Sequence, residues 1–267
     1  MLNLGVDLKN PTQDTADIVS EALAEHLIVV IRNQHITPEE QLTFCKMIGE
    51  VESHWDNDWK RERMGSLSIA DGVTRVTGAI GHDGRPGLFH KPETLEWHAN
   101  SVTKPDRHSI VWIYANKGSM GSRTSWINMV KVYESLPAEI QTELETMKIH
   151  TKHVAEVNGG SEKSFFNDVV SETAFDVVRE NSEGQKGLYY PFLQISHSPT
   201  HEDKFEELHE IIVEHALDPY HMYHHDWVDG DVVISDQWLT LHQREAFENI
   251  KEREMHRIAL YYGDNNA

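Results

Sequence analysis

The stretch GDVVISDQWLTLHQR, residues 230–244, indicates the class of fold to which the chain belongs. A Gly-Asp turn opens it, and the short, β-branched run from Asp231 to Ser235 is typical of a buried strand. Three polar residues, Asp236, Gln237 and His242, follow this strand closely. We therefore predict a β-rich core, with candidate functional side chains just beyond the end of the strand.

Two arginines follow at the start of a second predicted strand, one just before and one within the range from about Met255 to Tyr262. Arg253 lies eleven residues after His242, and Arg257 lies fifteen residues after it. Alternate residues of a strand share a face, so Arg253, Met255 and Arg257 point the same way. On an interior face, two guanidiniums would be costly unless anions neutralised them. The alternative is an exposed strand face on which nearby glutamates pair with both arginines.

The rest of the chain alternates strand and helix signals. Strands are predicted over residues 27–31, 109–114 and 175–179, with further short strands from about residue 66 onward. Helices are predicted over residues 14–26, from the N-cap Thr37 to about Gly49, over 129–146 with a break at Pro137, and over 202–216. Residues 155–170 are predicted to be a long loop of the kind that can cover a site. The fold class is therefore mainly β with flanking helices.

Length, composition and charge restrict the class of protein. The 267 residues are 39% hydrophobic and contain no repeat or linker, which favours one domain spanning residues 1–267. The chain has 24 Lys and Arg against 44 Asp and Glu, a formal net charge of −20. A phosphate backbone would be repelled on average, so no nucleic-acid partner is expected.

Cysteine content and hydropathy indicate the compartment. Cys45 is the single cysteine, so no internal disulfide can form, and it is expected to pack as a small apolar side chain. The N-terminus lacks the basic start and apolar stretch of a secretory signal. The longest aliphatic run, Leu27 to Ile31, is far too short to cross a membrane. We expect a cytoplasmic protein with no membrane partner. The sequence is compatible with a monomer or a homo-oligomer.

The stretch LEWHAN, residues 95–100, is the second candidate for chemistry. It lies at the end of a predicted strand, where His98 and Asn100, two residues apart, project from one face. Both side chains could reach one metal ion. Without a partner elsewhere in the chain, His98 would be an ordinary turn or surface histidine.

Together these stretches resemble the taurine dioxygenase (TauD/TfdA-like) family. One mark of the family is Trp-His-x-Asp in the first third of the chain. Another, late in the chain, is Gly-Asp, an apolar strand, Asp-Asn, four further residues and a histidine, with Arg-x-x-x-Arg after it. Three further stretches fall in the family's order: VVIRNQHITPEEQLTFCKMIGEV, GSRTSWINMVKVYESLP and VVRENSEGQKGLYY. The resemblance covers nearly the whole chain and implies a double-stranded β-helix (jelly-roll, cupin-like) core.

The resemblance also implies an activity, which is that of an Fe(II)- and 2-oxoglutarate-dependent dioxygenase. Such an enzyme uses dioxygen to oxidise, and in most cases hydroxylate, a small organic substrate, with release of succinate and CO2. By the resemblance, iron(II) is held by His98 and His242 together with Asn100. Thr124 and Arg253 match the residues that bind the distal carboxylate of 2-oxoglutarate, and a guanidinium suits that bidentate contact. Arg257 matches a residue that binds an acidic group of the primary substrate, so the substrate is expected to be an anion. The alternatives are core histidines, a turn or N-cap threonine and surface arginines.

Asn100 departs from the family pattern, which has an aspartate at this place. A neutral amide oxygen coordinates iron more weakly than a carboxylate, and the site gains one unit of positive charge. Three hypotheses stay open: a working oxygenase site completed by Asn100 or water, a halogenase-like variant site, and a non-catalytic or inactivated 2-oxoglutarate- and metal-binding protein.

Other histidines are expected to be structural or on the surface. They are those of PYHMYHHDW, namely His221, His224 and His225, and the pair His150 and His153. Trp126, beside Thr124, either lines the substrate pocket or belongs to the core. Substrate contacts are expected on variable loops, chiefly residues 55–95 and 155–175.

Overall fold

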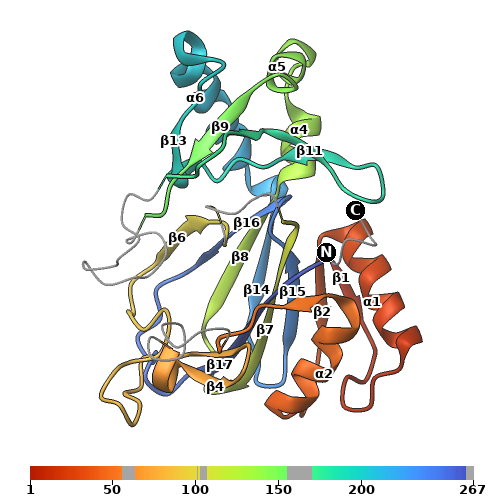
Figure 1. Cartoon of the computed structure of the whole chain (residues 1–267), viewed down its shortest axis with the longest axis vertical. Coiled ribbons are helices and arrows are strands. Elements are labelled where there is room, and N and C mark those ends of the chain that lie inside the picture. Colours follow the sequence, from red (N-terminus) through yellow and green to blue (C-terminus); the bar gives the residue numbers. More distant parts are fainter. Residues whose placement is uncertain (56–63, 101, 103–106, 155–169, 263–267) are drawn as a thin grey trace.

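The computed structural model describes residues 1–55, 64–100, 102, 107–154 and 170–262, and its body consists of two β-sheets with helices around them (Figure 1). The larger sheet has eight strands, and apart from the parallel pair β1 and β2 its neighbours are antiparallel. Its order is β1 (Leu2–Leu4), β2 (Ile28–Ile31), β15 (Val232–Asp236), β7 (Ser109–Lys117), β17 (Glu254–Tyr261), β5 (Val73–Val76) and β4 (Ser68–Ala70), with β3 (Glu50–Val51) paired to β17.

The smaller sheet is antiparallel and has four strands, in the order β14 (Met222–Asp226), β8 (Arg123–Asn128), β16 (Thr240–Arg244) and β6 (Leu95–His98). Its inner face packs on that of the larger sheet: Trp126 of β8 clusters with Val233 of β15 and Met255 of β17. The space between the two sheets is therefore lined by side chains from both.

Two helices cover the outer face of the larger sheet, α1 (Gln13–His26) and α2 (Pro38–Ile48). Thr37 and Glu40 form the predicted capping box of α2, and the helix ends before Gly49 as expected. Val232 and Ile234 of β15 pack under these helices, whereas Val233 faces the space between the sheets. A strand covered on both faces needs apolar residues throughout, which explains the uninterrupted VVI of β15.

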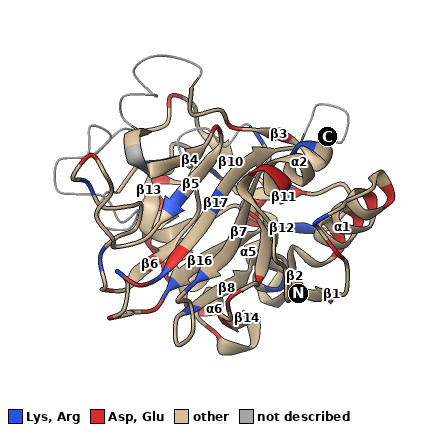
Figure 2. Cartoon of the chain, turned by 90° about the horizontal axis from the view of Figure 1, so that it is seen from below, with Lys and Arg blue, Asp and Glu red and all other residues tan. Residues whose placement is uncertain are grey.

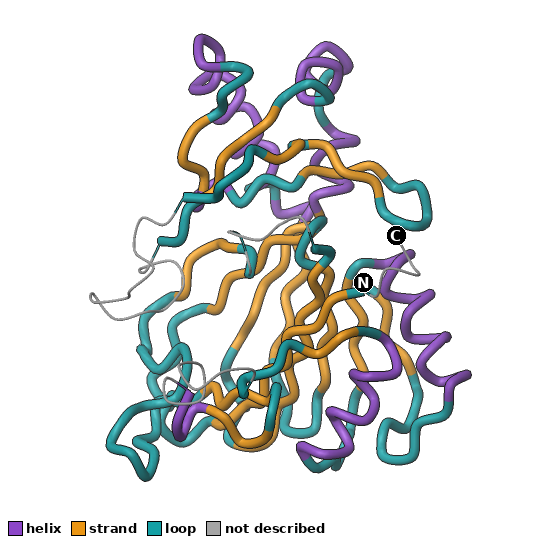
Figure 3. The backbone as a smooth tube through the Cα atoms, viewed as in Figure 1, coloured by secondary structure: helices purple, strands orange, loops and turns teal. Residues whose placement is uncertain are grey.

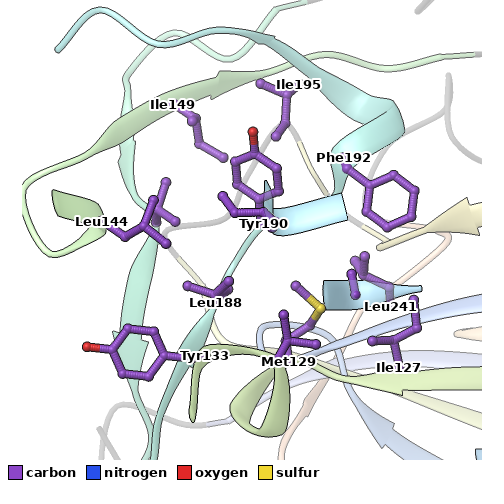
Figure 4. Close-up of a cluster of buried hydrophobic side chains, with 14 of the residues drawn as sticks. Ile127, Met129, Tyr133, Leu144, Ile149, Leu188, Tyr190, Phe192, Ile195 and Leu241 are labelled. Atoms are coloured by element: carbon purple, nitrogen blue, oxygen red, sulfur yellow. The ribbon is translucent and has the colours of Figure 1, made fainter. Parts of the chain in front are cut away.

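A third layer caps one end of the sheets and contains most of the remaining helices (Figure 3). Its helices are α4 (Met129–Ser135), α5 (Ala138–Leu144) and α6 (Phe205–Ala216), and its strands are β9 (Lys148–Thr151), β10 (Phe175–Asp176), β11 (Val178–Glu180), β12 (Lys186–Leu188) and β13 (Ile195–His197). Short 3-10 turns are η1 (Gly65–Leu67), η2 (Phe192–Gln194), η3 (Glu202–Lys204) and η4 (Pro219–His221). The apolar cluster of the third layer includes Met129, Tyr190 and Leu241 (Figure 4). This layer is therefore packed onto β16, the strand that carries His242.

The structure confirms most predicted elements and corrects one. The helix over residues 129–146 is indeed interrupted at Pro137, which separates α4 from α5. The strand predicted over residues 175–179 is wrong as a single element, because β10 pairs with β9 whereas β11 pairs with β12. The expected loop over residues 155–170 lies outside the described residues except at Val170.

Acidic side chains are exposed on the first helix, whereas the single cysteine is buried. Exposed Asp14, Asp17, Glu21 and Glu25 line the outer side of α1 (Figure 2). Cys45 is a free cysteine, fully buried among apolar side chains, as predicted, and burial raises the pKa of its thiol. Among the described residues, no helix is long and apolar enough to span a membrane.

Candidate active site

His98 and His242 are direct neighbours between the two sheets. They pair across the antiparallel strands β6 and β16, and their ring centroids lie 4.1 Å apart. His98 is 0% exposed, and its Nδ1 donates to the backbone carbonyl of Glu96 at 2.6 Å. A carbonyl only accepts, so the lone pair of His98 is on Nε2, which is buried without a hydrogen-bond partner among the described residues. On His242 the buried nitrogen without a partner among the described residues is Nδ1, so each of the two adjacent rings has one nitrogen that no described residue contacts.

Both imidazoles are neutral at physiological pH. Burial lowers the pKa of His98 to about 4, and the positive charge of Arg257 acts in the same direction. Burial also holds the pKa of His242 well below its usual value, with further lowering by His98 and Arg257. Since a metal ion binds the neutral ring, neither histidine would have to lose a proton near pH 7.

The low pKa of His98 makes the stability of the metal-free protein depend on pH. The unfolded chain binds a proton at this residue below about pH 6.5, and the folded chain only below about pH 4, so stability falls as the pH drops through that interval. We expect His98 alone to reduce the free energy of unfolding by about 2 kcal/mol between pH 7.5 and pH 5. Urea unfolding of the metal-free parent and of His98→Gln at both pH values measures this difference. An equal loss in the two proteins would contradict the assignment.

Asn100 follows β6 on a bend, and its side chain reaches the histidine pair. Its Nδ2 lies 3.2 Å from Nε2 of His242 and 3.0 Å from Oε1 of Gln237. The backbone before it is fixed by Gln194, which bonds to both the N–H (2.9 Å) and the carbonyl (3.3 Å) of Ala99. The structure thus brings together His98, Asn100 and His242, as the sequence predicted, with Gln237 of the same motif and with Gln194, which the motifs did not indicate.

Three arginines line the pocket beside these residues. Arg253 and Arg257 point into it with Met255, which confirms the predicted alternation, and Arg244 of β16 joins them. Nε and Nη2 of Arg253, Nε and Nη1 of Arg244, and Nε of Arg257 are buried without a hydrogen-bond partner among the described residues. No Asp or Glu belongs to the described lining of this pocket. The alternative of an exposed strand face is therefore wrong, and the pocket suits bound anions.

Burial and mutual repulsion weaken the protonation of these guanidiniums. Burial, together with the nearby charge of Arg244, lowers the pKa of Arg253 to about 9. Burial also lowers the pKa of Arg244 and that of Arg257. An anion placed between Arg244 and Arg253 would remove this penalty.

Thr124 and Arg244 lie side by side on the pocket face, because they are direct partners of β8 and β16. The hydroxyl of Thr124 accepts a hydrogen bond from Nε1 of Trp227 at 2.9 Å. Its own hydrogen therefore remains available for an acceptor in the pocket. Nη2 of Arg244 donates to the backbone carbonyls of Lys91 (2.8 Å) and Glu93 (2.6 Å), which ties the segment before β6 to the pocket.

Arg244 was not predicted to be a site residue, although its position two residues after His242 on the same strand places both side chains on one face. Trp126 meets both expectations, since it is 2% exposed and also lines the pocket.

The remaining histidines have partners outside the pocket. His225 contacts Asp231 at 3.0 Å, His224 contacts Ser125 at 2.7 Å, and His221 contacts the carbonyl of His215 at 2.8 Å. The ring of His150 stacks on that of His197, with the centroids 4.7 Å apart. These residues are structural or lie at the surface, as predicted.

Comparison with known proteins assigns the chain to a class of oxygenases. Residues 2–259 match the family described as "Taurine catabolism dioxygenase TauD, TfdA family", and the chain belongs to this family. The family resemblance found in the sequence is thereby confirmed, and the chain is an enzyme of the dioxygenase class.

Individual relatives are distant but match over most of their length. The (S)-phenoxypropionate/alpha-ketoglutarate-dioxygenase of Sphingobium herbicidovorans is 24% identical over 254 residues, covering 88% of this chain and 82% of that protein. Pentalenolactone F synthase of Streptomyces arenae is 24% identical over 265 residues, covering 91% and 85%. The solved structure of AAD-2 in complex with Mn(II) and N-oxalylglycine matches with a TM-score of 0.79 at 21% identity, covering 100% of this chain and 96% of that one. The last comparison shows a shared fold.

Proposed function

We propose that this protein is an Fe(II)- and 2-oxoglutarate-dependent dioxygenase that oxidises a small anionic organic substrate, with release of succinate and CO2. The observation that carries the proposal is one pocket in which the neutral imidazole of His242, 4.1 Å from that of the buried His98, lies beside three guanidiniums, with no carboxylate in the described lining. A metal ion suits the first group and organic anions suit the second. The two sheets that enclose the pocket would be the halves of a double-stranded β-helix core in a single domain.

The described residues fit an iron(II) site. His98 and His242 would hold the ion through their imidazoles, and Asn100 or a small ligand beside it would complete the protein side of the site. Iron(II) with bound 2-oxoglutarate supplies the activation of dioxygen, in which the keto acid is oxidised to succinate and CO2 and the substrate is oxidised. The protein contributes placement of the reactants and exclusion of water.

The distal carboxylate of 2-oxoglutarate would bind at the end of the pocket formed by Arg253 and Thr124. Arg253 is 1% exposed, so its bond to a carboxylate would be sheltered from water. Thr124 would donate the hydroxyl hydrogen that its bond to Trp227 leaves available. Arg244, whose charge acts on Arg253, would give this carboxylate a second cationic neighbour.

Arg257 lies nearer the histidines, since its charge lowers the pKa of both His98 and His242. At this place it would bind an acidic group of the primary substrate and so hold the reacting carbon near the metal. The name of the Sphingobium relative indicates a carboxylate substrate for that enzyme, which agrees with an anionic substrate here.

Arg257→Ala should therefore raise the concentration of primary substrate needed for half-maximal rate by about 10-fold or more, while affinity for 2-oxoglutarate changes little. Steady-state kinetics with an accepted substrate, together with calorimetric titration of 2-oxoglutarate, separates the two effects. A loss of 2-oxoglutarate affinity in Arg257→Ala, with Arg253→Ala unaffected, would show that the two arginines have exchanged functions.

The proposed function is tested by succinate formation in air. The purified protein is supplied with Fe(II) and 2-oxoglutarate, with and without a panel of small carboxylates and sulfonates. We expect succinate, and a faster rate with the substrate class that Arg257 binds. Binding of Fe(II) and 2-oxoglutarate without any succinate would instead indicate a non-catalytic binding protein.

A further inference from the structure

Two positions that differ from the family's sequence pattern contact each other in the structure. The pattern has Asp where this chain has Asn100, and Asn where it has Gln237. Oε1 of Gln237 accepts from the backbone N–H of Asn100 at 3.2 Å and from its side-chain Nδ2 at 3.0 Å. Gln237 is 1% exposed, so water does not replace these contacts readily.

The orientation of the Gln237 amide is fixed by partners that can act only as hydrogen-bond donors or only as acceptors. The backbone N–H of Asn100 can only donate, so the oxygen of Gln237 must face it. The carbonyls of Ser235 (3.3 Å) and Asp236 (3.4 Å) can only accept, so the nitrogen of Gln237 must face them. Turning the amide round would lose both sets of hydrogen bonds.

A fixed acceptor at Gln237 decides which chemical group suits position 100. The atom facing Oε1 must be a donor, and in Asn100 this atom is Nδ2, which also lies 3.2 Å from Nε2 of His242. A carboxylate at this position, or Asn100 turned to present its oxygen, would bring two acceptor oxygens together in a buried place. The chain is therefore arranged to keep an N–H group beside His242.

We propose that Gln237 is a positioning residue that makes position 100 a hydrogen-bond donor in place of a carboxylate ligand. The inference rests on the proposed function and refines it. His98 and His242 are the protein ligands of the metal, and Asn100 donates through Nδ2 to a water or other small ligand in the third position. Asn100 is then a functional feature of this site, and its orientation depends on Gln237.

The test is a double-mutant cycle on the full chain with Asn100→Asp, Gln237→Asn and the double variant. The first readout is thermal unfolding of the metal-free proteins at pH 7.5. Asn100→Asp should lower the melting temperature by about 2–4 °C when Gln237 is present, and by much less in combination with Gln237→Asn. Equal lowering in both backgrounds would overturn the proposal.

The second readout is Mn(II) affinity, measured from free Mn(II) by electron paramagnetic resonance. Asn100→Asp should bind Mn(II) within about threefold of the parent, and the double variant at least about tenfold more tightly than Asn100→Asp. A tenfold gain in Asn100→Asp alone, with nothing added by Gln237→Asn, would overturn the proposal, because the carboxylate would then ligate freely beside Gln237.

The matched control is Gln194→Asn combined with Asn100→Asp. Gln194 is a buried glutamine that holds the backbone of the neighbouring residue Ala99, and its shortening should not raise the Mn(II) affinity of Asn100→Asp. An equal gain from Gln194→Asn would overturn the specific assignment to Gln237. Absence of Mn(II) binding in every variant, with the thermal coupling still present, would overturn the proposed metal site and support the selection of an amide by Gln237.

Discussion

Arg253→Ala is expected to weaken binding of 2-oxoglutarate by roughly 30- to 5,000-fold, which corresponds to a loss of about 2–5 kcal/mol. The reason is that Arg253 is 1% exposed and has two guanidinium nitrogens without a partner among the described residues. A carboxylate bound there would make charge-assisted hydrogen bonds that water cannot replace in a sheltered pocket. Calorimetric titration of the Mn(II)-loaded protein with 2-oxoglutarate in the absence of oxygen measures the loss.

The matched control for this prediction is Arg123→Ala. Arg123 is the residue before Thr124 on the same strand, but its side chain is 41% exposed and pairs with Asp226 at 2.7 Å. Its removal should leave the affinity for 2-oxoglutarate unchanged. If Arg253→Ala binds 2-oxoglutarate as tightly as the parent does, the cosubstrate is not held at this arginine.

His242→Ala is expected to reduce the affinity for a divalent metal ion by more than about 100-fold. Loss of a residue that only orients a ligand costs 10- to 100-fold in metal affinity, and His242 is proposed to be a ligand itself. Its ring lines the pocket and lies 4.1 Å from that of His98. Titration with Mn(II), followed by electron paramagnetic resonance, gives both affinities.

Unfolding must be separated from ligand loss in this experiment. His221→Ala serves as the control, because His221 is another buried histidine at the edge of the smaller sheet, bonded to the carbonyl of His215. It should lose stability in urea without losing Mn(II). Retention of parental Mn(II) affinity by a folded His242→Ala protein would show that the ion, if bound, lies elsewhere.

Local sequence signals predicted the elements whose determinants are local. The capping box of Thr37 and Glu40 fixes the start of α2, and Pro137 fixes the break between α4 and α5, because caps and proline act on adjacent backbone groups. The strand over residues 175–179 could not be divided in advance. Val177 bonds to Met147 on one side and Tyr189 on the other, and this change of partner depends on the tertiary structure.

In the pocket, too, features with local determinants could be predicted, whereas contacts that depend on the tertiary structure could not. The motifs predicted that His98, Asn100, His242 and Arg253 would gather, since each lies at a recognisable position on or beside a strand. The contact between Asn100 and Gln237 joins residues 137 positions apart and depends on how two strand ends meet. Neither spacing nor composition contains that information, and the polar residues that orient the motif residues became evident only in the fold.

An anaerobic absorption titration shows whether one pocket holds both a metal ion and 2-oxoglutarate. Fe(II) and 2-oxoglutarate are added to the protein, singly and together, and the visible metal-to-ligand charge-transfer band is recorded before air is admitted. The band should appear only with both components, reach saturation at one equivalent of Fe(II), vanish in His242→Ala, and require far more 2-oxoglutarate in Arg253→Ala. A parent protein that develops no band with both components, or a band that is unchanged in these two variants, would contradict the account.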